Sequence, residues 1–151
     1  MVLIRSDLDE TDEAIGALQS ILGFHIRLAH GAVYRHFTET FAVLGLTQKQ
    51  VSVLWLVDEF PGIAQVELGG RLQMDRATTM TIVNRLQERR FLRRERSAVD
   101  RRMQSLFLTG EGSTALAQAK QCVTQHEAWL KRRFIPDEIE KLVEMLARIH
   151  E

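Results

Sequence analysis

The sequence predicts a mainly α-helical chain with one small β-hairpin, an α+β fold in which helices dominate. Three observations lead to this prediction. Apolar residues recur at spacings of three and four through most of the chain, as in amphipathic helices. The two prolines, Pro61 and Pro136, fall between such segments. Two strand-like runs, 91–96 and 103–108, flank a polar connection, which is typical of a hairpin.

Length and composition indicate one globular domain over residues 1–151. Of the 151 residues, 45% are hydrophobic and 26% are charged, which excludes a disordered or fibrous chain. A chain of this length needs no disulfide or metal staple. The longest largely apolar run, 51–57, falls well short of the roughly 18 residues that a membrane span requires. An acidic N-terminus unlike a secretory signal, and the single cysteine Cys122, favour a cytoplasmic location.

The net charge of zero hides an uneven distribution. Residues 71–102 contain ten arginines and four acids, a net charge of +6, so the remainder carries −6. A concentrated basic segment attracts a polyanion even when the whole chain is neutral. A solvated helix face is the alternative explanation for such a run, so the local pattern must distinguish the two.

The first predicted helix spans roughly residues 11–44, and its stripe consists of Ile26, His30, Val33, Phe37, Phe41 and Leu44. Gly45 follows at a natural C-cap position. Thr47 and Gln50 fit a capping box that opens a second helix, which buries Val51, Leu54 and Val57 and ends before Pro61.

The next elements predict a winged helix-turn-helix over residues 46–109. A short helix at about 65–72 and a longer one at about 76–89 are joined by three residues. Gly69 and Gly70 permit close backbone approach, and Asp75 can cap the longer helix. The strands 91–96 and 103–108, joined by a polar loop at 97–102, then form a basic hairpin, the wing.

The chain ends in two further predicted helices. Thr109 is expected to cap a long helix with apolar positions at Leu116, Ala119, Val123, Trp129 and Leu130. Pro136 opens a last helix whose stripe is Ile139, Leu142, Val143, Leu146 and Ile149. The core of a small winged helix leaves the apolar stripes at the two ends of the chain without a surface to pack against. We therefore expect segments 1–45 and 110–151 to be dimerisation helices that bury these stripes between two copies of the chain.

The helix at 76–89 has two faces when its residues are spaced at 100°. The side expected to pack inward carries Thr79, Met80, Val83, Leu86 and Arg90. The outer side is small and polar with one long cation, which suits the major groove of double-stranded DNA, and it consists of Ala77, Thr78, Thr81 and Arg85. Arg76 and Gln65, at the starts of the two helices, are predicted to bind phosphate.

The predicted wing supplies the other candidate DNA contacts. It carries Arg93, Arg94, Arg96, Arg101 and Arg102. An arginine near a loop tip can enter the narrow minor groove, and Arg96, Arg101 and Arg102 are the candidates for this role. The carboxylate of Asp100 is expected to pair with a nearby arginine and to brace the wing.

These pieces together resemble the MarR family of transcriptional regulators. The run LGGRLQMDRATTMTIVNRLQERRFLRR resembles the helix-turn-helix and first strand of the family, and Asp100-Arg-Arg102 followed by Leu108-Thr109 resembles its wing signature. With the flanking helices, the resemblance covers nearly the whole chain. It implies a homodimer on a pseudo-palindromic operator and repression relieved by a small molecule, often a phenolic or aromatic acid. Two positions depart from the pattern, Arg90 in place of glycine and Ala64 in place of a Ser or Thr cap.

A possible effector site lies in the first predicted helix. Arg27, His30 and Tyr34 fall within about 60° of one another and offer a cation, a hydrogen-bond donor and a ring to an anionic aromatic ligand. Trp55 can supply another wall. A position along the dimer seam is the alternative. The run 24–50 also resembles regulators of aromatic-acid catabolism, some of which respond to CoA thioesters, so the expected effector is an aromatic acid or its CoA thioester.

Rival chemistries have weaker support. Residues 110–115 fit the dinucleotide pattern G-x-G-x-x-A, but no second parallel strand follows. His126 begins a zinc-protease motif that Leu130 interrupts. Cys122 and His126, one turn apart, leave open a metal-responsive regulator of the same fold, and a constitutive DNA-binding module is a further alternative. No catalytic constellation is found, so the sequence predicts neither an enzyme nor a bound cofactor.

Overall fold

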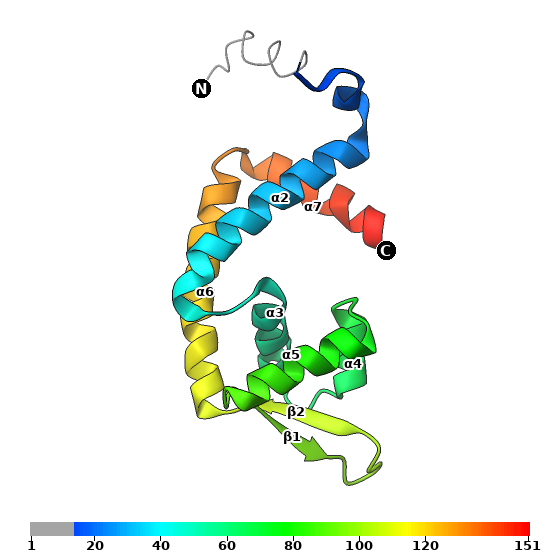
Figure 1. Cartoon of the computed structure of the whole chain (residues 1–151), viewed down its shortest axis with the longest axis vertical. Helices are drawn as coiled ribbons and strands as arrows, with labels where there is room; N and C mark the ends of the chain where they lie inside the picture. Colours follow the sequence, from blue (N-terminus) through cyan, green and yellow to red (C-terminus); the bar gives the residue numbers. More distant parts are fainter. Residues whose placement is uncertain (1–13) are drawn as a thin grey trace. The chain divides into compact units, whose positions relative to one another are not determined.

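The structure is a computed structural model that describes residues 14–151 (Figure 1). It divides into two compact units, one ending at His36 and one comprising Phe37–Glu151. The helices and strands follow one another as η1 (Gly16–Ser20), α2 (Leu22–Phe41), η2 (Ala42–Leu44), α3 (Gln48–Glu59), α4 (Gln65–Arg71), α5 (Arg76–Glu88), β1 (Leu92–Arg96), β2 (Gln104–Leu108), α6 (Gly110–Lys131) and α7 (Pro136–His150). The predicted mainly α-helical fold with one hairpin is confirmed.

The prediction of one continuous helix over residues 11–44 is wrong. Gly16 has φ +54, a left-handed value that glycine adopts without a steric penalty, and it begins the separate 3-10 helix η1. Ile21 is then extended, with φ −92 and ψ 108, so the helical hydrogen-bond ladder starts afresh at Leu22. Residues 11–13 of the predicted helix lie outside the described residues. At the other end, Gly45 has φ 59 and takes the predicted C-cap position after η2.

Helix α3 lies at the centre of the second unit. Its predicted capping box is confirmed, because the Gln50 backbone N–H donates to the Thr47 hydroxyl at 3.2 Å and the Thr47 N–H donates to the Gln50 side chain at 3.0 Å. The helix packs against α4, α5, α6 and β2. Its fully buried Val53 and Leu54 therefore hold α4, α5 and the long helix α6 around one core.

The turn between α4 and α5 depends on one glycine of the predicted pair. A Cβ atom on Gly69 would lie 2.6 Å from the Thr79 hydroxyl oxygen, so the two helices approach too closely for any other residue there. A Cβ on Gly70 would meet open space. Met74 N–H closes the turn by donating to the Gly69 carbonyl at 2.9 Å. The close approach that the sequence predicted thus rests on Gly69.

The hairpin β1–β2 is antiparallel, with Leu92 opposite Leu108 and Arg96 opposite Gln104. The segment after α3 runs along the other side of β2: the Gly62 N–H donates to the Leu106 carbonyl at 2.8 Å, and the Leu106 N–H donates to the Ile63 carbonyl at 3.0 Å. Leu92 and Leu106 are almost fully buried. These contacts fix the wing to the helical core beneath α3, α4 and α5 (Figure 1).

Helix α6 begins where its second glycine touches the wing. The Thr109 hydroxyl caps the helix by accepting from the Gly112 N–H at 2.9 Å, as predicted. A Cβ on Gly112 would lie 2.0 Å from the Phe91 carbonyl oxygen. Close packing thus accounts for Gly112 in the G-x-G-x-x-A pattern. Within residues 14–151, the strands form a single two-stranded antiparallel sheet, which is not a dinucleotide-binding arrangement.

Helix α7 leaves its apolar side in solvent. Val143, Leu146 and Ile149 are 62%, 43% and 62% exposed in the single chain. Pro136 occupies the first turn, as predicted. Within the described part of the chain, no single helix is long and apolar enough to cross a membrane. The pair Leu22–Leu44 and Gln48–Glu59 reaches that length and composition only when taken together, across a bend of 69°.

Candidate DNA-binding interface

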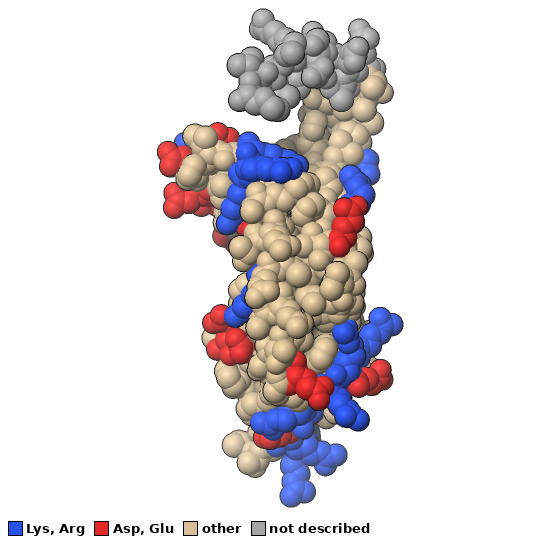
Figure 2. Space-filling view, turned by 90° about the vertical axis from the view of Figure 1, so that its left-hand side faces the viewer, with Lys and Arg blue, Asp and Glu red and all other residues tan. Residues whose placement is uncertain are grey.

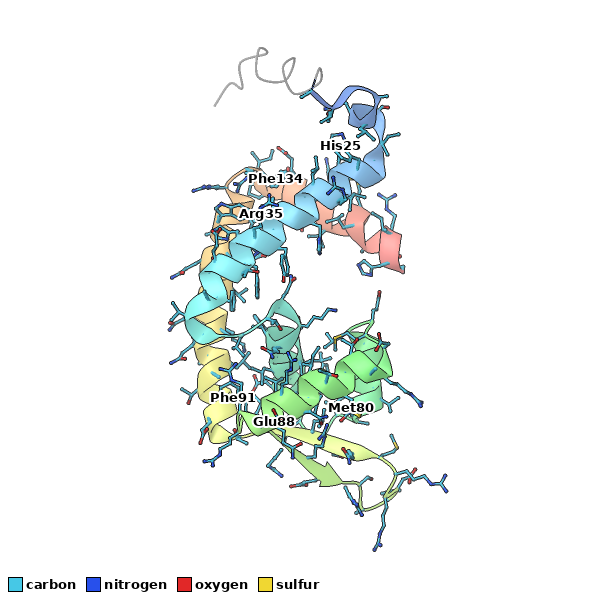
Figure 3. The ribbon with its side chains drawn as sticks, viewed as in Figure 1. His25, Arg35, Met80, Glu88, Phe91 and Phe134 are labelled. Carbon is cyan, nitrogen blue, oxygen red and sulfur yellow. The ribbon has the colours of Figure 1, made fainter. Side chains whose placement is uncertain are left out.

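Helix α5 buries a slightly different side from the one predicted. Thr79, Ile82, Val83 and Leu86 are buried, whereas Met80 is 51% exposed (Figure 3). Met80 lies about 60° beyond Val83 around the axis, which takes it off the inner face. Arg90 is exposed and follows the end of the helix with φ 64. The predicted inward positions of Met80 and Arg90 are therefore wrong, and Ile82 belongs to the inner face.

The outer side of α5 is exposed at Ala77, Thr81 and Arg85, and Thr78 is half-buried. Both threonine hydroxyls donate locally, Thr81 to the Ala77 carbonyl at 2.9 Å and Thr78 to the Asp75 carboxylate at 3.1 Å. Because each hydroxyl proton is used, these residues offer a methyl group and oxygen lone pairs to the outside. A methyl group suits thymine, and a lone pair can accept from the amino group of adenine or cytosine.

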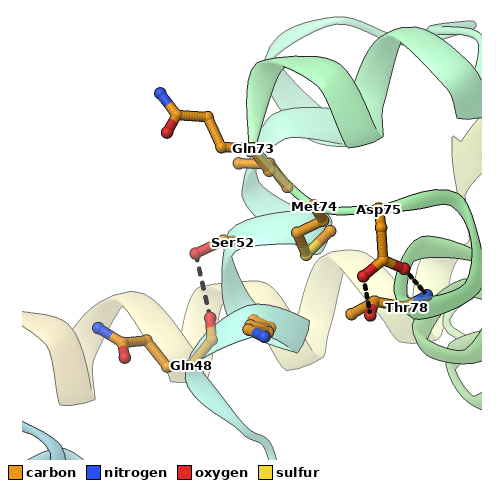
Figure 4. A pocket seen from close by; sticks show the side chains of 8 residues that line it. Gln48, Ser52, Gln73, Met74, Asp75 and Thr78 are labelled. Atoms are coloured by element: carbon orange, nitrogen blue, oxygen red, sulfur yellow. Dashed lines mark hydrogen bonds between the residues drawn. The ribbon is translucent and has the colours of Figure 1, made fainter. Parts of the chain in front are cut away.

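Asp75 fixes the first turn of this helix. Its carboxylate accepts the Thr78 backbone N–H at 2.7 Å and the Thr78 hydroxyl (Figure 4). These two hydrogen bonds hold the pKa of Asp75 below its usual value, and the bond from the backbone N–H has the larger effect. The positive charge of Lys49 acts in the same direction. The carboxylate lines a cavity of about 270 Å³ between the start of α3 and the α4–α5 turn. Arg76, at the first position of α5, is exposed.

The wing loop is held by its own backbone. Ser97 N–H donates to the Met103 carbonyl at 2.9 Å, and Met103 N–H donates to the Asp100 carbonyl at 3.0 Å. The Asp100 carboxylate accepts the backbone N–H of Arg102 at 3.0 Å. Among the described residues no arginine guanidinium forms an ion pair with Asp100, which corrects the expected pairing. Asp100 therefore holds the loop through the backbone and leaves the guanidinium groups of Arg101 and Arg102 exposed.

The other wing arginines differ in their surroundings. Arg96 is exposed at the end of β1. Arg93 stands over the Phe107 ring at 4.4 Å and pairs with Glu95. Lysine and arginine side chains gather at the lower end of the face in Figure 2, the end that holds the wing. A basic surface beside an exposed helix is the electrostatic footprint expected for a nucleic-acid contact.

Arg94 forms a network that the sequence analysis missed. Its guanidinium donates to the side-chain oxygens of Gln65 at 3.2 Å, Gln87 at 2.7 Å and Asn84 at 2.6 Å. Partial burial lowers the pKa of Arg94 from its ordinary value. The network joins β1 to both helices of the helix-turn-helix. Gln65, predicted to contact phosphate, thus directs its oxygen to Arg94.

Arg89 forms a second link that was not predicted. Its guanidinium donates to the carbonyl oxygens of Gly45 at 2.7 Å and Leu44 at 3.1 Å, and it stands over the Phe91 ring at 4.7 Å. Arg89 is the C-cap residue of α5, whereas Leu44 ends η2. One side chain therefore connects the last turn of α5 to the end of the helical segment that continues α2.

The candidate effector residues are only partly together. The rings of His30 and Tyr34 are stacked, 6.3 Å apart at an interplanar angle of 14°. Arg27 instead stands over the Phe24 ring at 5.1 Å. Trp55 belongs to the second unit, where the Lys120 ammonium lies 4.8 Å from its ring centroid. The structure thus brings His30 and Tyr34 together and places Arg27 against a different ring.

Cys122 and His126 have the surroundings of packing residues. His126 is 5% exposed and lies against the rings of Phe37 and Trp129, with centroids 5.4 and 5.7 Å away. Cys122 is half-buried against the core. In the part of the chain that the structure describes, no group of three or more His, Cys, Asp or Glu side chains is placed to hold a metal ion.

Comparison with known proteins places this geometry in context. A sequence profile of the MarR family matches residues 44–103. A protein of Thauera aromatica, described as a transcriptional regulator for the hcr operon, is 31% identical over 97% of this chain and 87% of its own length. The transcriptional repressor CouR bound to a 23-mer DNA duplex is 36% identical, with a TM-score of 0.86 over 91% of this chain and 97% of CouR. CouR bound to p-coumaroyl-CoA is 34% identical, with a TM-score of 0.82 over 90% and 96%.

Proposed function

The chain belongs to the MarR family of DNA-binding transcriptional regulators, and we propose that within this family it is a homodimeric repressor released from its operator by a small effector. The similarity to CouR on DNA, over 91% of the chain, carries the proposal. Regulators of this family are not enzymes, and neither is this protein.

In this proposal residues 46–109 bind DNA. Ala77, Thr78, Thr81 and Arg85 meet base edges in the major groove, since they form the outward side of α5. Arg76 binds phosphate at the start of that helix. The exposed Arg101 and Arg102 at the wing tip, with Arg96 at the end of β1, reach the backbone and the minor groove.

Residues 1–45 and 110–151 form the dimer interface in this proposal. The exposed stripe of α7 supports it, because Val143 and Ile149 are each 62% exposed in one chain. A hollow of about 350 Å³ beside Ile139 and Val143 is lined mostly by carbon, which a second chain can fill. Dimers are typical of the family, and two copies would present two α5 helices to a pseudo-palindromic site.

The proposed effector is an aromatic acid or its CoA thioester. CouR, at 34% identity, was solved with p-coumaroyl-CoA. In this chain the stacked rings of His30 and Tyr34 offer an aromatic surface and hydrogen-bonding groups on α2. An effector lowers DNA affinity only to the extent that it binds the DNA-free arrangement of the dimer more tightly.

The test begins with selection of a binding duplex from a random-sequence DNA pool by the purified protein. Release of that duplex is then followed by fluorescence anisotropy with p-coumarate, p-coumaroyl-CoA and free CoA. The proposal expects p-coumarate or its thioester to weaken binding, and free CoA to leave binding unchanged. If a wider set of aromatic acids and thioesters neither releases DNA nor raises Tm, the protein is a constitutive DNA-binding module.

A further inference from the structure

We propose that Arg94 is a positioning residue for operator reading: it binds the side-chain oxygens of Gln65, Asn84 and Gln87 and thereby turns their amide N–H groups toward DNA. The inference rests on the DNA-binding function of the chain and adds three neutral hydrogen-bond donors to the proposed contacts. It assigns Arg94 a role unlike that of the wing-tip arginines, because Arg94 acts through its neighbours.

The geometry uses three different nitrogen atoms of one guanidinium. Nε donates to Gln65 at 3.2 Å, Nη1 to Gln87 at 2.7 Å and Nη2 to Asn84 at 2.6 Å. The three partners come from α4 and α5, and Arg94 itself comes from β1. A planar guanidinium has its donors in a fixed fork, so the three amides are held at fixed angles to one another.

Amide chemistry then determines what faces outward. A guanidinium has donors and no acceptor, so each amide must turn its oxygen toward Arg94. The NH₂ group, on the opposite side of the same carbon, must point away. Phosphate oxygens, guanine N7 and O6, adenine N7 and thymine O4 all accept hydrogen bonds. Without Arg94, each amide is able to turn either end outward and distinguishes a donor from an acceptor poorly.

The positions of the three amides fit this role. Asn84 lies about 60° from Thr81 around α5, at the edge of the proposed base-reading face. Gln87 is exposed one turn further along. Gln65 is the first residue of α4 and lines a hollow of about 150 Å³ together with Arg102 and Gln104 of the wing region. The three amides thus follow the border between the base-reading helix and the wing.

Arg94 is poorly placed to contact phosphate directly. It is half-buried, and three of its five N–H groups already donate to the three amides. Arg101, in contrast, is exposed, and no ion pair holds it among the described residues. Removal of Arg94 should therefore reduce sequence discrimination with little change in the salt dependence of binding, whereas removal of a phosphate contact does the reverse.

The test compares wild type, Arg94→Gln and Arg94→Lys on the selected operator and on a scrambled duplex across a salt series. For both variants we expect the operator-to-scrambled affinity ratio to fall about tenfold or more, because one good base contact is worth ~5–150-fold. The salt slope should change by much less than the ~2 that a dimer loses with one phosphate contact per chain. Lysine keeps the charge but cannot bind three diverging oxygens, so it should not restore the ratio.

Gln87→Glu separates positioning from stability if the Arg94 variants do not fold. The carboxylate still accepts from Arg94, now with a charge, but it has no N–H to offer to DNA. Gln104→Glu adds the same charge to the wing, where no contact with Arg94 is involved. We expect both variants to bind all duplexes more weakly than the wild type does. Only Gln87→Glu should lower the operator-to-scrambled affinity ratio, by about tenfold relative to Gln104→Glu.

Several outcomes would overturn the inference. Equal affinity ratios for Gln87→Glu and Gln104→Glu would show that the Gln87 donor does not read sequence. A loss of ~2 in the salt slope of Arg94→Gln with an unchanged ratio would make Arg94 a direct phosphate contact. A wild-type protein that selects no duplex would contradict the DNA-binding function itself, whereas a selective wild type with unaffected variants contradicts only the role of Arg94.

Discussion

The Arg89 guanidinium donates to the Gly45 carbonyl at 2.7 Å across 44 residues of sequence. Its second hydrogen bond, to the Leu44 carbonyl at 3.1 Å, gives a donor to another carbonyl at the same helix end. The positive charge also complements the negative end of the helix dipole. Arg89 therefore links the end of η2 to the C-cap of α5, the proposed base-reading helix, and we predict that this link helps to orient α5.

Arg89→Lys should break this link, because one ammonium cannot reproduce both hydrogen bonds and the ring contact. We expect the variant to lose about 1 kcal/mol of unfolding free energy, the usual value of an exposed charged hydrogen bond after screening. Arg133→Lys is the matched control, since Arg133, just past the end of α6, also donates to a carbonyl and stands over a ring, both of Trp129 four residues earlier. Urea unfolding and operator titration measure the two effects.

The two variants should differ in DNA binding more than in stability. Loss of the link between α2–η2 and α5 should weaken operator binding by Arg89→Lys, and Arg133→Lys should bind the operator as the wild type does. Equal operator affinities for the two variants would show that the Arg89 link stabilises the fold without orienting α5.

Local features of the fold were accessible from the sequence, and long-range contacts were not. The Thr47–Gln50 capping box and the Asp75 cap were predicted because each involves residues three positions apart. Most of the hydrogen bonds that Arg89 and Arg94 donate join residues 29 to 45 positions apart in the sequence. Composition does not predict such pairs. The sequence held one indication of the Arg94 network. Asn84 and Gln87 are two amides three residues apart, and they face a basic strand.

The two sides of α5 show that even a small error in the predicted helix phase puts a wrong residue on the inner face. Met80 and Ile82 are both apolar, so periodicity alone places either one inside. The structure buries Ile82 because the inner face is centred on Thr79, Val83 and Leu86. The proposed base-reading residues Ala77, Thr81 and Arg85 are exposed in either phase. Their contact with DNA stays a prediction.

Arg90→Gly should stabilise the protein. Arg90 has φ 64, a left-handed value that costs an L-residue about 1–2 kcal/mol, whereas glycine in its place costs about 0.5–1 kcal/mol of unfolded-state entropy. We expect a net gain of about 0.5–1 kcal/mol in unfolding free energy. Glu88→Gly, two residues earlier within α5, should instead destabilise by about 1 kcal/mol. Loss of stability in Arg90→Gly would mean that the arginine side chain contributes more than its backbone costs.

The stabilising charge on Asp75 should disappear in acid. Its pKa is lowered in the folded state by the Thr78 hydrogen bonds, so its contribution is complete above the unfolded pKa of about 3.9 and is lost as the pH falls through the folded value. Asp75→Asn keeps an oxygen acceptor and removes the charge. Thermal melts should show the wild type more stable at pH 7 and the difference shrinking below about pH 4. A difference independent of pH would assign the cap to hydrogen bonding alone.

The apolar side of α7 should be required for dimerisation. Val143→Glu places a charge on a residue that is 62% exposed in one chain, and burial of an unpaired charge between two chains is costly. Lys141→Glu, about 160° away around the helix, is the control. Analytical ultracentrifugation should give a monomer for Val143→Glu and a dimer for Lys141→Glu. A dimeric Val143→Glu protein would exclude this side of α7 from the interface.

The two DNA-contacting elements should be separable by salt. Thr81→Ala or Arg85→Ala removes a proposed base contact and should change which operator variants are preferred, by ~1–3 kcal/mol at the affected base pair. Arg101→Ala removes a proposed phosphate contact and should weaken binding to all DNA sequences alike.

Each lost phosphate contact reduces the slope of log affinity against log salt by ~0.9, so a dimer that loses two such contacts should show a change of ~2. Arg102→Ala is a useful comparison, because the Arg102 backbone N–H, which Asp100 binds, is unaffected by the substitution. The loop should therefore keep its shape, and Arg102→Ala should lower the slope in the same way as Arg101→Ala. Operator titrations at several salt concentrations measure these slopes. An unchanged slope and affinity for both variants would show that the tip of the wing does not touch DNA.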